Sequence, residues 1–244
     1  MLFTLSITGL IVGSFLNVVI YRLPRGKSIV WPGSYCPDCG QKIKVIDLLP
    51  VLNYLWLKGQ CRFCNHKISL CYPLVEILTL TAFLLIYMNF GLSGESLAGA
   101  LLTIWLIPAA FIDVFHGIIP NQISITGLVI GLGNSLFTIG ITSSIIGALF
   151  FGGVLLLAAV LSGGGMGGGD IKMAAAIGAF TGWQGAILAF ILSSLLGGVV
   201  GLFLLISHKA NRKSTIKYGP YLALAGFIAY VWGVQIIECY IALF

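Results

Sequence analysis

Residues 163–172 read Gly-Gly-Gly-Met-Gly-Gly-Gly-Asp-Ile-Lys and stand between two long apolar stretches. Asp170 in this run and Asp113 are the only acidic residues between Glu95 and Glu238. A carboxylate at the edge of hydrocarbon costs about 2.5–3.5 kcal/mol on insertion scales, so by default it marks a functional site. Each aspartate lies at the end of a hydrophobic span, and the two together indicate an acid–base pair.

The composition around this run is that of a membrane protein. Of the 244 residues, 59% are hydrophobic and 8% are charged, whereas a soluble domain carries about 25% charged residues. The 32 glycines suit closely packed membrane helices. We therefore expect an integral membrane protein that is surrounded by lipid along most of its length.

The topology depends on the short apolar run from Asp170 to Gly182. Its 13 residues rise about 20 Å as a helix, less than the hydrocarbon core of about 30 Å. If this run crosses, all 13 basic residues lie on one side, as the positive-inside rule requires. If it does not cross, Lys209 to Lys217 lie outside, against that rule.

We therefore predict an all-α polytopic membrane protein with about eight transmembrane helices and the N-terminus outside. Asp113, Asp170 and Lys172 then face the cytoplasm, and a turn over 183–185 joins the short span to the next. The expected spans are Leu2–Tyr21, Tyr72–Phe90, Leu97–Phe115, Asn121–Ile139, Ser143–Leu161, Asp170–Gly182, a span ending at Ile206, and Tyr218–Leu243.

The distribution of positive charge indicates topology and not a nucleic-acid partner. The net charge is +6, and eight of the basic residues fall between Arg22 and Lys67. They flank apolar spans, whereas nucleic-acid binding needs a basic face on a folded domain. The predicted parts are a first transmembrane helix (1–22), a small cytoplasmic domain (23–71) and a transmembrane domain that carries both aspartates (72–244).

The cytoplasmic segment contains two Cys-x-x-Cys pairs with 21 residues between them. Four thiolates suit tetrahedral Zn²⁺, and four protein ligands leave no open position, so the predicted zinc is structural. The alternatives are disulfides or free thiols, but disulfides seldom persist in the cytoplasm. A segment of this size with a thin core benefits from a metal. The predicted ligands are Cys36, Cys39, Cys61 and Cys64.

The two aspartates allow two interpretations. Aspartate is a preferred N-cap, so either residue could simply cap a helix. The glycines before Asp170 favour the other interpretation, because they permit positive φ and close approach of a substrate backbone. Two nearby carboxylates share one proton. The ionised one can activate water while the protonated one donates to a carbonyl oxygen, which is peptide hydrolysis without a covalent intermediate.

Several motifs along nearly the whole chain resemble those of the type IV prepilin peptidases, the leader peptidases and N-methyltransferases of the GxGD aspartyl protease group. The two cysteine pairs match that family's zinc-binding cysteines. The other matching blocks are Gly13–Pro24, Ile68–Glu76, Ile112-Asp113 with Ile119–Asn121, and Gly167–Lys172. Together these blocks are specific, whereas a lone GxGD would not be.

The resemblance implies eight helices with a cytoplasmic zinc domain in the bacterial inner membrane. It implies cleavage of class III signal peptides of type IV prepilins or pseudopilins after glycine, on the cytoplasmic side. The new N-terminal residue is then methylated from S-adenosylmethionine. The match assigns Asp113 and Asp170 as the catalytic pair. The link from Pro24 to Cys36 is shorter than in many members, which bears on methyl transfer.

Five further residues are candidates for substrate binding or methyl transfer: Gly167, Gly169, Lys172, Glu76 and Asn17. A carboxylate such as Glu76 is costly to bury near a span. It is expected to contact Arg22 or substrate, or to assist methylation. The alternative is a helix N-terminal carboxylate favoured by the macrodipole. Lys172 could stabilise an ionised aspartate, although positive-inside placement explains it equally well.

A different class of function also uses paired membrane carboxylates: a proton- or ion-coupled transporter. Transporters place such groups near the midplane, often within internal repeats. Both aspartates here stand at span ends, and no repeat is visible in the sequence. A zinc-ribbon scaffold or methyltransferase without peptidase activity is a further alternative.

Overall fold

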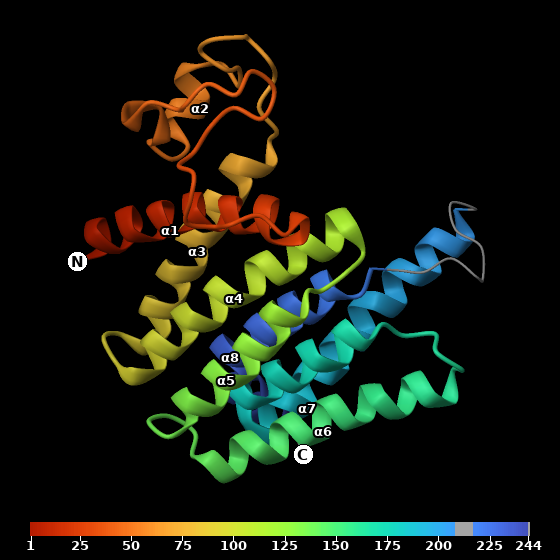
Figure 1. Ribbon diagram of the computed structural model, residues 1–244. Coiled ribbons are helices and arrows are strands. Elements are labelled where there is room, and N and C mark those ends of the chain that lie inside the picture. Colours follow the sequence, from red (N-terminus) through yellow and green to blue (C-terminus); the bar gives the residue numbers. More distant parts are fainter. Residues whose placement is uncertain (208–216, 244) are drawn as a thin grey trace. The chain divides into compact units, whose positions relative to one another are not determined.

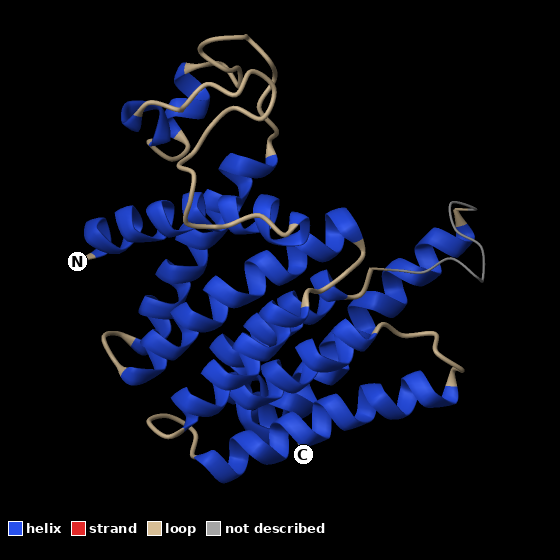
Figure 2. Ribbon diagram, viewed as in Figure 1, coloured by secondary structure: helices blue, strands red, loops and turns tan. Residues whose placement is uncertain are grey.

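The computed structural model describes residues 1–207 and 217–243, and every regular element in these ranges is a helix (Figures 1 and 2). Two compact units divide the chain at Gly91. The first holds α1 (Leu2–Arg22), the short helices η1 (Leu23–Arg25), η2 (Val45–Leu48) and α2 (Leu52–Trp56), and α3 (Cys71–Phe90). The second holds α4 (Gly94–His116), α5 (Asn121–Ser135), α6 (Ile141–Leu161), α7 (Gly168–Ile206) and α8 (Gly219–Ile241).

Six of the described helices, α1, α3, α4, α6, α7 and α8, are long and apolar enough to cross a membrane. The expected all-helical membrane architecture is therefore confirmed. The fifth helix, α5, has 15 residues, which corresponds to a length of about 22 Å. The count of eight crossings remains a prediction. The charge argument for it used Lys209, Arg212 and Lys213, which lie outside the described residues.

In the first unit, α1 and α3 pack closely because glycines face α3. A side-chain carbon at Gly9 would come within 2.9 Å of the Leu80 backbone, and one at Gly13 within 2.7 Å of the Glu76 backbone. Asn17, one turn further along α1, donates to the Tyr72 carbonyl over 3.0 Å. The partners fall in reverse order, so the two helices are antiparallel. Small residues allow this backbone approach.

In the second unit, α7 folds back on itself at Gly182, where φ is 69° and the helix is interrupted. Gly147 of α6 packs on Gly178, and Gly152 packs on Ala175, so α6 and the first half of α7 are antiparallel. The Phe151 ring nevertheless lies 6.3 Å from that of Phe190. In a straight helix Phe190 would lie about 18 Å beyond Gly178, on the side away from Phe151. The contact between the two rings therefore requires the second half of α7 to turn back.

The expected reversal after Asp170 is thus present, and in Figure 1 the second half of α7 runs back alongside the first half. The turn over 183–185 is wrong in detail. Residues Trp183, Gln184 and Gly185 are helical, and the break falls at Gly182. Glycine takes this role because only it adopts a positive φ without steric cost.

A close backbone contact in the second unit joins α6 to the first half of α7. A side-chain carbon on Gly147 would collide with the Gly178 carbonyl, and one on Gly178 would collide with the Gly147 carbonyl. Beside this contact the Ser144 hydroxyl donates to the Ala179 carbonyl over 2.6 Å. Two backbones that touch leave no volume for a side chain on either helix.

Gly178→Ala should therefore destabilise the protein by about 1–3 kcal/mol, the usual cost of overpacking. The matched control is Gly153→Ala on α6, where the added carbon meets open space. Thermal unfolding of the purified proteins in detergent measures the difference. Equal melting temperatures for the two variants would contradict this packing.

Candidate functional site

Asp113 lies in the last turn of α4, which ends at Gly117 with a left-handed φ of 66°. Its carboxylate is buried, with 5% of the residue exposed. The Oδ2 atom accepts a hydrogen bond from the Gly219 backbone N–H over 2.9 Å. A helix C-terminus already carries partial negative charge, so a buried carboxylate there needs a donor, and the start of α8 supplies it.

Asp170 lies in the first turn of α7, directly after the glycine-rich loop. The N-cap of α7 is Gly167, so neither Asp170 nor Asp113 is the N-cap residue that the capping alternative requires. A side-chain carbon on Gly167 would stand 3.3 Å from Asp170 Oδ2. The glycine loop therefore leaves one side of this half-exposed carboxylate open to an approaching backbone.

Contacts between the α4–α5 connection and the start of α7 bring the two aspartates to one end of the second unit. Gly169 packs so closely on Ile119 that a side-chain carbon there would lie 2.9 Å from Ile119 Cβ. Lys172 Nζ donates to Asn121 Oδ1 over 2.6 Å. Asp113 precedes Ile119 by six residues and Asp170 directly follows Gly169, so this contact brings both carboxylates to the same site. Asp113 is buried there and Asp170 is half-exposed.

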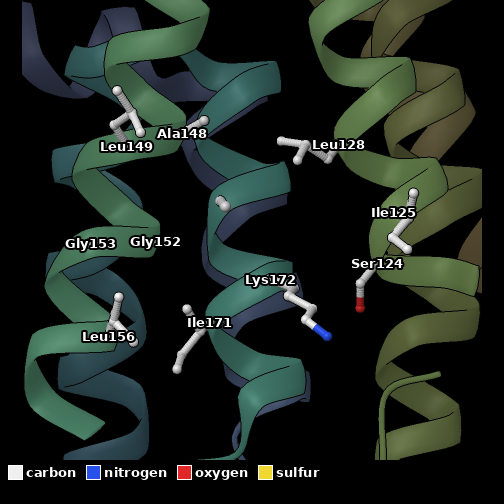
Figure 3. Close-up of a pocket in the computed structure, with 11 residues that line it drawn as sticks. Ser124, Ile125, Leu128, Ala148, Leu149, Gly152, Gly153, Leu156, Ile171 and Lys172 are labelled. Carbon is white, nitrogen blue, oxygen red and sulfur yellow. The ribbon is translucent and has the colours of Figure 1, made fainter. Parts of the chain in front are cut away.

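A pocket of about 310 Å³ lies beside the start of α7, between α5 and α6 (Figure 3). Its lining is apolar except for Ser124 and Lys172. In Figure 3 the Lys172 side chain extends from α7 toward Ser124 on α5. The remaining lining residues are Ile125, Leu128, Ala148, Leu149, Gly152, Gly153, Leu156, Ile171 and Ala175.

The four predicted ligand cysteines form one cluster in the first unit. Their sulfur atoms all lie within 4.8 Å of one another, and Cys36 Sγ is 3.9 Å from Cys64 Sγ. Tetrahedral zinc with Zn–S bonds of about 2.3 Å places its sulfurs about 3.8 Å apart. All six cysteines are free thiols, so the disulfide alternative finds no support, and Cys71 and Cys239 stand outside the cluster.

Two similar turns build this cluster. After each cysteine pair the chain enters a left-handed residue, Gly40 with φ 70° and Asn65 with φ 58°. Backbone N–H groups of Cys64 and Phe63 then face the Cys61 sulfur. Hydrogen-bond donors of this kind favour the thiolate, which is the metal-binding form. The donor set and its backbone environment therefore fit a tetrahedral metal ion.

Glu76 and Asn17 lie in the first unit and are both buried. Glu76 stands in the second turn of α3, beyond the first turn where the macrodipole acts most strongly. Its Oε2 accepts the Val51 N–H over 2.8 Å. Val51 has a φ of 60°, which is an outlier for a β-branched residue. Such strain persists only where surrounding contacts enforce it.

The expected contact between Glu76 and Arg22 is not among the ion pairs of the described residues. Arg22 instead donates to the carbonyls of Ser28, Pro32 and Gly33 at 2.7–3.1 Å. It therefore holds the loop after α1 in place, and its charge is spread over backbone oxygens. The partners of the buried Glu76 carboxylate are the Val51 N–H and the Ser14 side chain on α1.

Reasoning from the sequence missed three residues that touch the candidate groups. Gly219 and Lys217 approach the end of α4 from more than 100 residues away, and Val51 reaches Glu76 from the cysteine segment. The sequence predicted a span that begins at Tyr218, but not that the start of this span contacts Asp113. No local pattern identifies Val51 or Lys217.

Comparison with known proteins agrees with this organisation. Residues 7–90 match the bacterial peptidase A24 N-terminal domain, and residues 100–202 match the type IV leader peptidase family. The chain is 36% identical to a prepilin leader peptidase/N-methyltransferase of Aeromonas hydrophila over 96% of its own length and 92% of the relative's.

Proteins of the same name give similar values. Identity is 36% with that of Pseudomonas putida, over 95% of this chain and 90% of the relative. It is 36% with that of Pseudomonas aeruginosa, over 96% and 91%. No solved structure matches the chain. This multi-pass inner-membrane protein therefore belongs to the type IV leader peptidase family and is an enzyme of the aspartic peptidase class.

Proposed function

We propose that this enzyme cleaves the leader peptides of type IV prepilins or pseudopilins after glycine by a two-aspartate mechanism. The observation that carries the proposal is the contact between Gly169 and Ile119, which brings the end of α4 with Asp113 and the start of α7 with Asp170 to one end of the second unit. Both helices lie within the part of the chain that matches a leader peptidase family. The Gly167–Gly169 loop is the proposed place where the extended substrate backbone lies against Asp170.

In the proposed reaction one aspartate is ionised and the other protonated, because two adjacent carboxylates do not both ionise readily. The ionised one removes a proton from water, whose oxygen adds to the scissile carbonyl carbon. The protonated one donates to the carbonyl oxygen. Collapse of the tetrahedral intermediate breaks the C–N bond, and the amine leaves with a proton from the pair. No covalent enzyme intermediate forms.

We further propose eight membrane crossings, with α5 and each half of α7 crossing once. The N-terminus then lies outside, and the cysteine domain (23–71) and both aspartates face the cytoplasm. The two helices that are short for this role, α5 and the first half of α7, pack against other helices of the unit. Buried helices need not match the hydrocarbon thickness along their whole length.

The four cysteines are proposed to hold one structural Zn²⁺. The ion would supply a closed tetrahedral centre for a segment whose large hydrophobic residues, such as Trp31 and Trp56, are mostly exposed. Its ligands would be Cys36, Cys39, Cys61 and Cys64. Arg62 lies between Cys61 and Cys64 and forms an ion pair with Asp47, which links the second cysteine turn to η2.

Methyl transfer from S-adenosylmethionine to the new N-terminus is proposed to use the first unit. The relatives' printed name includes N-methyltransferase. S-adenosylmethionine would supply a methyl group on a positively charged sulfonium, and the buried Glu76 carboxylate fits that charge. Asn17, which donates to the Tyr72 carbonyl, holds the start of α3 near Glu76.

The transporter alternative receives less support. A coupling site near the midplane would place the carboxylates in the middle of helices. Asp113 lies in the last turn of α4, and Asp170 lies in the first turn of α7.

Asp113→Asn and Asp170→Asn should each reduce cleavage of a prepilin at least about 10³-fold, because neither amide can hold or transfer the proton. Mass spectrometry of the purified enzyme with a synthetic leader substrate measures the product. The control is Glu95→Gln, at the opposite end of α4. Near wild-type cleavage by either aspartate variant would show that the pair is wrongly assigned.

Metal analysis of the purified protein should find about one zinc per chain. Cys36→Ser should lower the zinc content and the melting temperature, because an incomplete ligand set binds weakly. Cys71→Ser and Cys239→Ser, which lie outside the cluster, should keep the full zinc content. A zinc-free preparation with full stability and activity would contradict a structural role for zinc.

Asp113→Asn should leave intact prepilin unmethylated, because no free amine appears, yet it should still methylate a precleaved peptide. Glu76→Gln should show the reverse, with cleavage retained and methylation of the precleaved peptide reduced at least about tenfold, because the sulfonium loses its counter-charge. Mass spectrometry with S-adenosylmethionine measures both products. If the wild-type protein adds no methyl group to either substrate, it is a peptidase only.

A further inference from the structure

The segment from Lys217 to Gly219 forms hydrogen bonds with two residues at the end of α4. The Gly219 N–H donates to Asp113 Oδ2 over 2.9 Å. Lys217 Nζ donates to the carbonyl of Val114, the next residue along α4. The Lys217 side chain also runs past Gly117, the C-cap of α4, whose hypothetical side-chain carbon would stand 3.8 Å from Lys217 Cε.

Position 219 tolerates only glycine in this arrangement. A side-chain carbon there would lie 2.8 Å from Asp113 Oδ2 and 3.0 Å from Asp113 Cβ. The backbone of the first residue of α8 therefore lies directly against the Asp113 carboxylate. Because Gly219 begins α8, its N–H is one of the helix's unpaired donors, and the positive end of the α8 dipole faces the carboxylate.

The two carboxylates receive unequal electrostatic support. The Lys217 ammonium, held at the Val114 carbonyl, places a positive charge beside the end of α4 that carries Asp113. Asp170, in the first turn of α7, lies beside the uncharged Gly167 backbone. Lys172, on the same helix as Asp170, is hydrogen-bonded to Asn121. A cation and a helix N-terminus both favour the ionised form of a carboxylate.

We propose that Lys217 and Gly219 form a clamp that holds Asp113 as the ionised general base, so that the shared proton resides on Asp170. Lys217 and Gly219 are positioning residues that act through Asp113. This assignment rests on the proposed peptidase function and adds to it the identity of the base and of the acid.

The assignment gives each proton a definite route. Asp113 takes a proton from water as the oxygen–carbon bond forms, while Asp170 gives its proton to the carbonyl oxygen. When the C–N bond breaks, the proton on Asp113 passes to the leaving amine, and the hydroxyl proton of the intermediate returns to Asp170. One water is consumed, and the pair ends in its starting state. The half-exposed position of Asp170 beside the glycine loop suits a group that must meet the substrate carbonyl.

Among the described residues, the charged and titratable groups around Asp113 are few. Lys217 approaches from the segment before α8, Asp170 from α7, and His116 follows on α4 itself. The base must be ionised in the free enzyme, so its ionisation sets the acid limb of the pH dependence of kcat/KM.

The test is the pH dependence of kcat/KM for prepilin cleavage by the full-length enzyme in lipid nanodiscs. Lys217→Met should move the acid limb to higher pH by about one unit, because a carboxylate without its cation ionises less readily. Lys217→Arg should restore the wild-type limb. Lys42→Met, which removes the same charge from the cysteine segment, should leave it unmoved.

Gly219→Ala should lower kcat at least about tenfold at every pH, since it displaces the base from the reacting water. Its melting temperature shows whether the variant folds, and the Lys217 series stands independently if it does not. The assignment of the base is overturned if the acid limb of Lys217→Met stays in place, or if only its alkaline limb moves. Either result leaves the peptidase mechanism standing as long as Asp113→Asn is inactive. Substantial cleavage by Asp113→Asn would instead overturn the proposed peptidase mechanism itself.

Discussion

In hydrocarbon, each backbone N–H and C=O group must find its partner inside the protein. This constraint makes the second unit a set of helices and leaves polar chemistry to their ends. Both aspartates obey it, since Asp113 closes α4 and Asp170 opens α7. Helix ends also carry unpaired backbone groups, and the site uses one of them when the Gly219 N–H meets Asp113.

Glycine makes the required proximity possible in three physical ways. At Gly147 and Gly178 it lets two helix backbones touch. At Gly182 it provides the positive φ at which α7 reverses. At Gly169 and Gly219 it lets one segment lie against another beside a carboxylate. The apolar helices gain no hydrophobic energy by leaving lipid for one another, so close contact of this kind supplies much of the packing that holds the site.

The first unit is organised differently, because its segment between α1 and α3 buries few hydrophobic side chains of its own. The cysteine cluster and the loop held by Arg22 organise it locally. Val51, in the same segment, reaches the buried Glu76 through a strained backbone. The conformation of the cysteine segment and the environment of Glu76 are therefore linked through one hydrogen bond, which joins the proposed metal centre to the proposed methyl-transfer group.

Composition and spacing alone determined the helical membrane class, the doubled cysteine pairs and the isolation of Asp113 and Asp170, because these follow from local pattern and the cost of burying charge. The tertiary structure alone decided which distant groups touch them. Gly219 and Lys217 lie more than 100 residues from Asp113 along the chain, and Val51 lies 25 residues from Glu76. The reversal at Gly182 instead of residues 183–185 is a similar case. Such contacts depend on how helices pack, and helix packing depends on shape across several segments, which no periodicity within one segment contains.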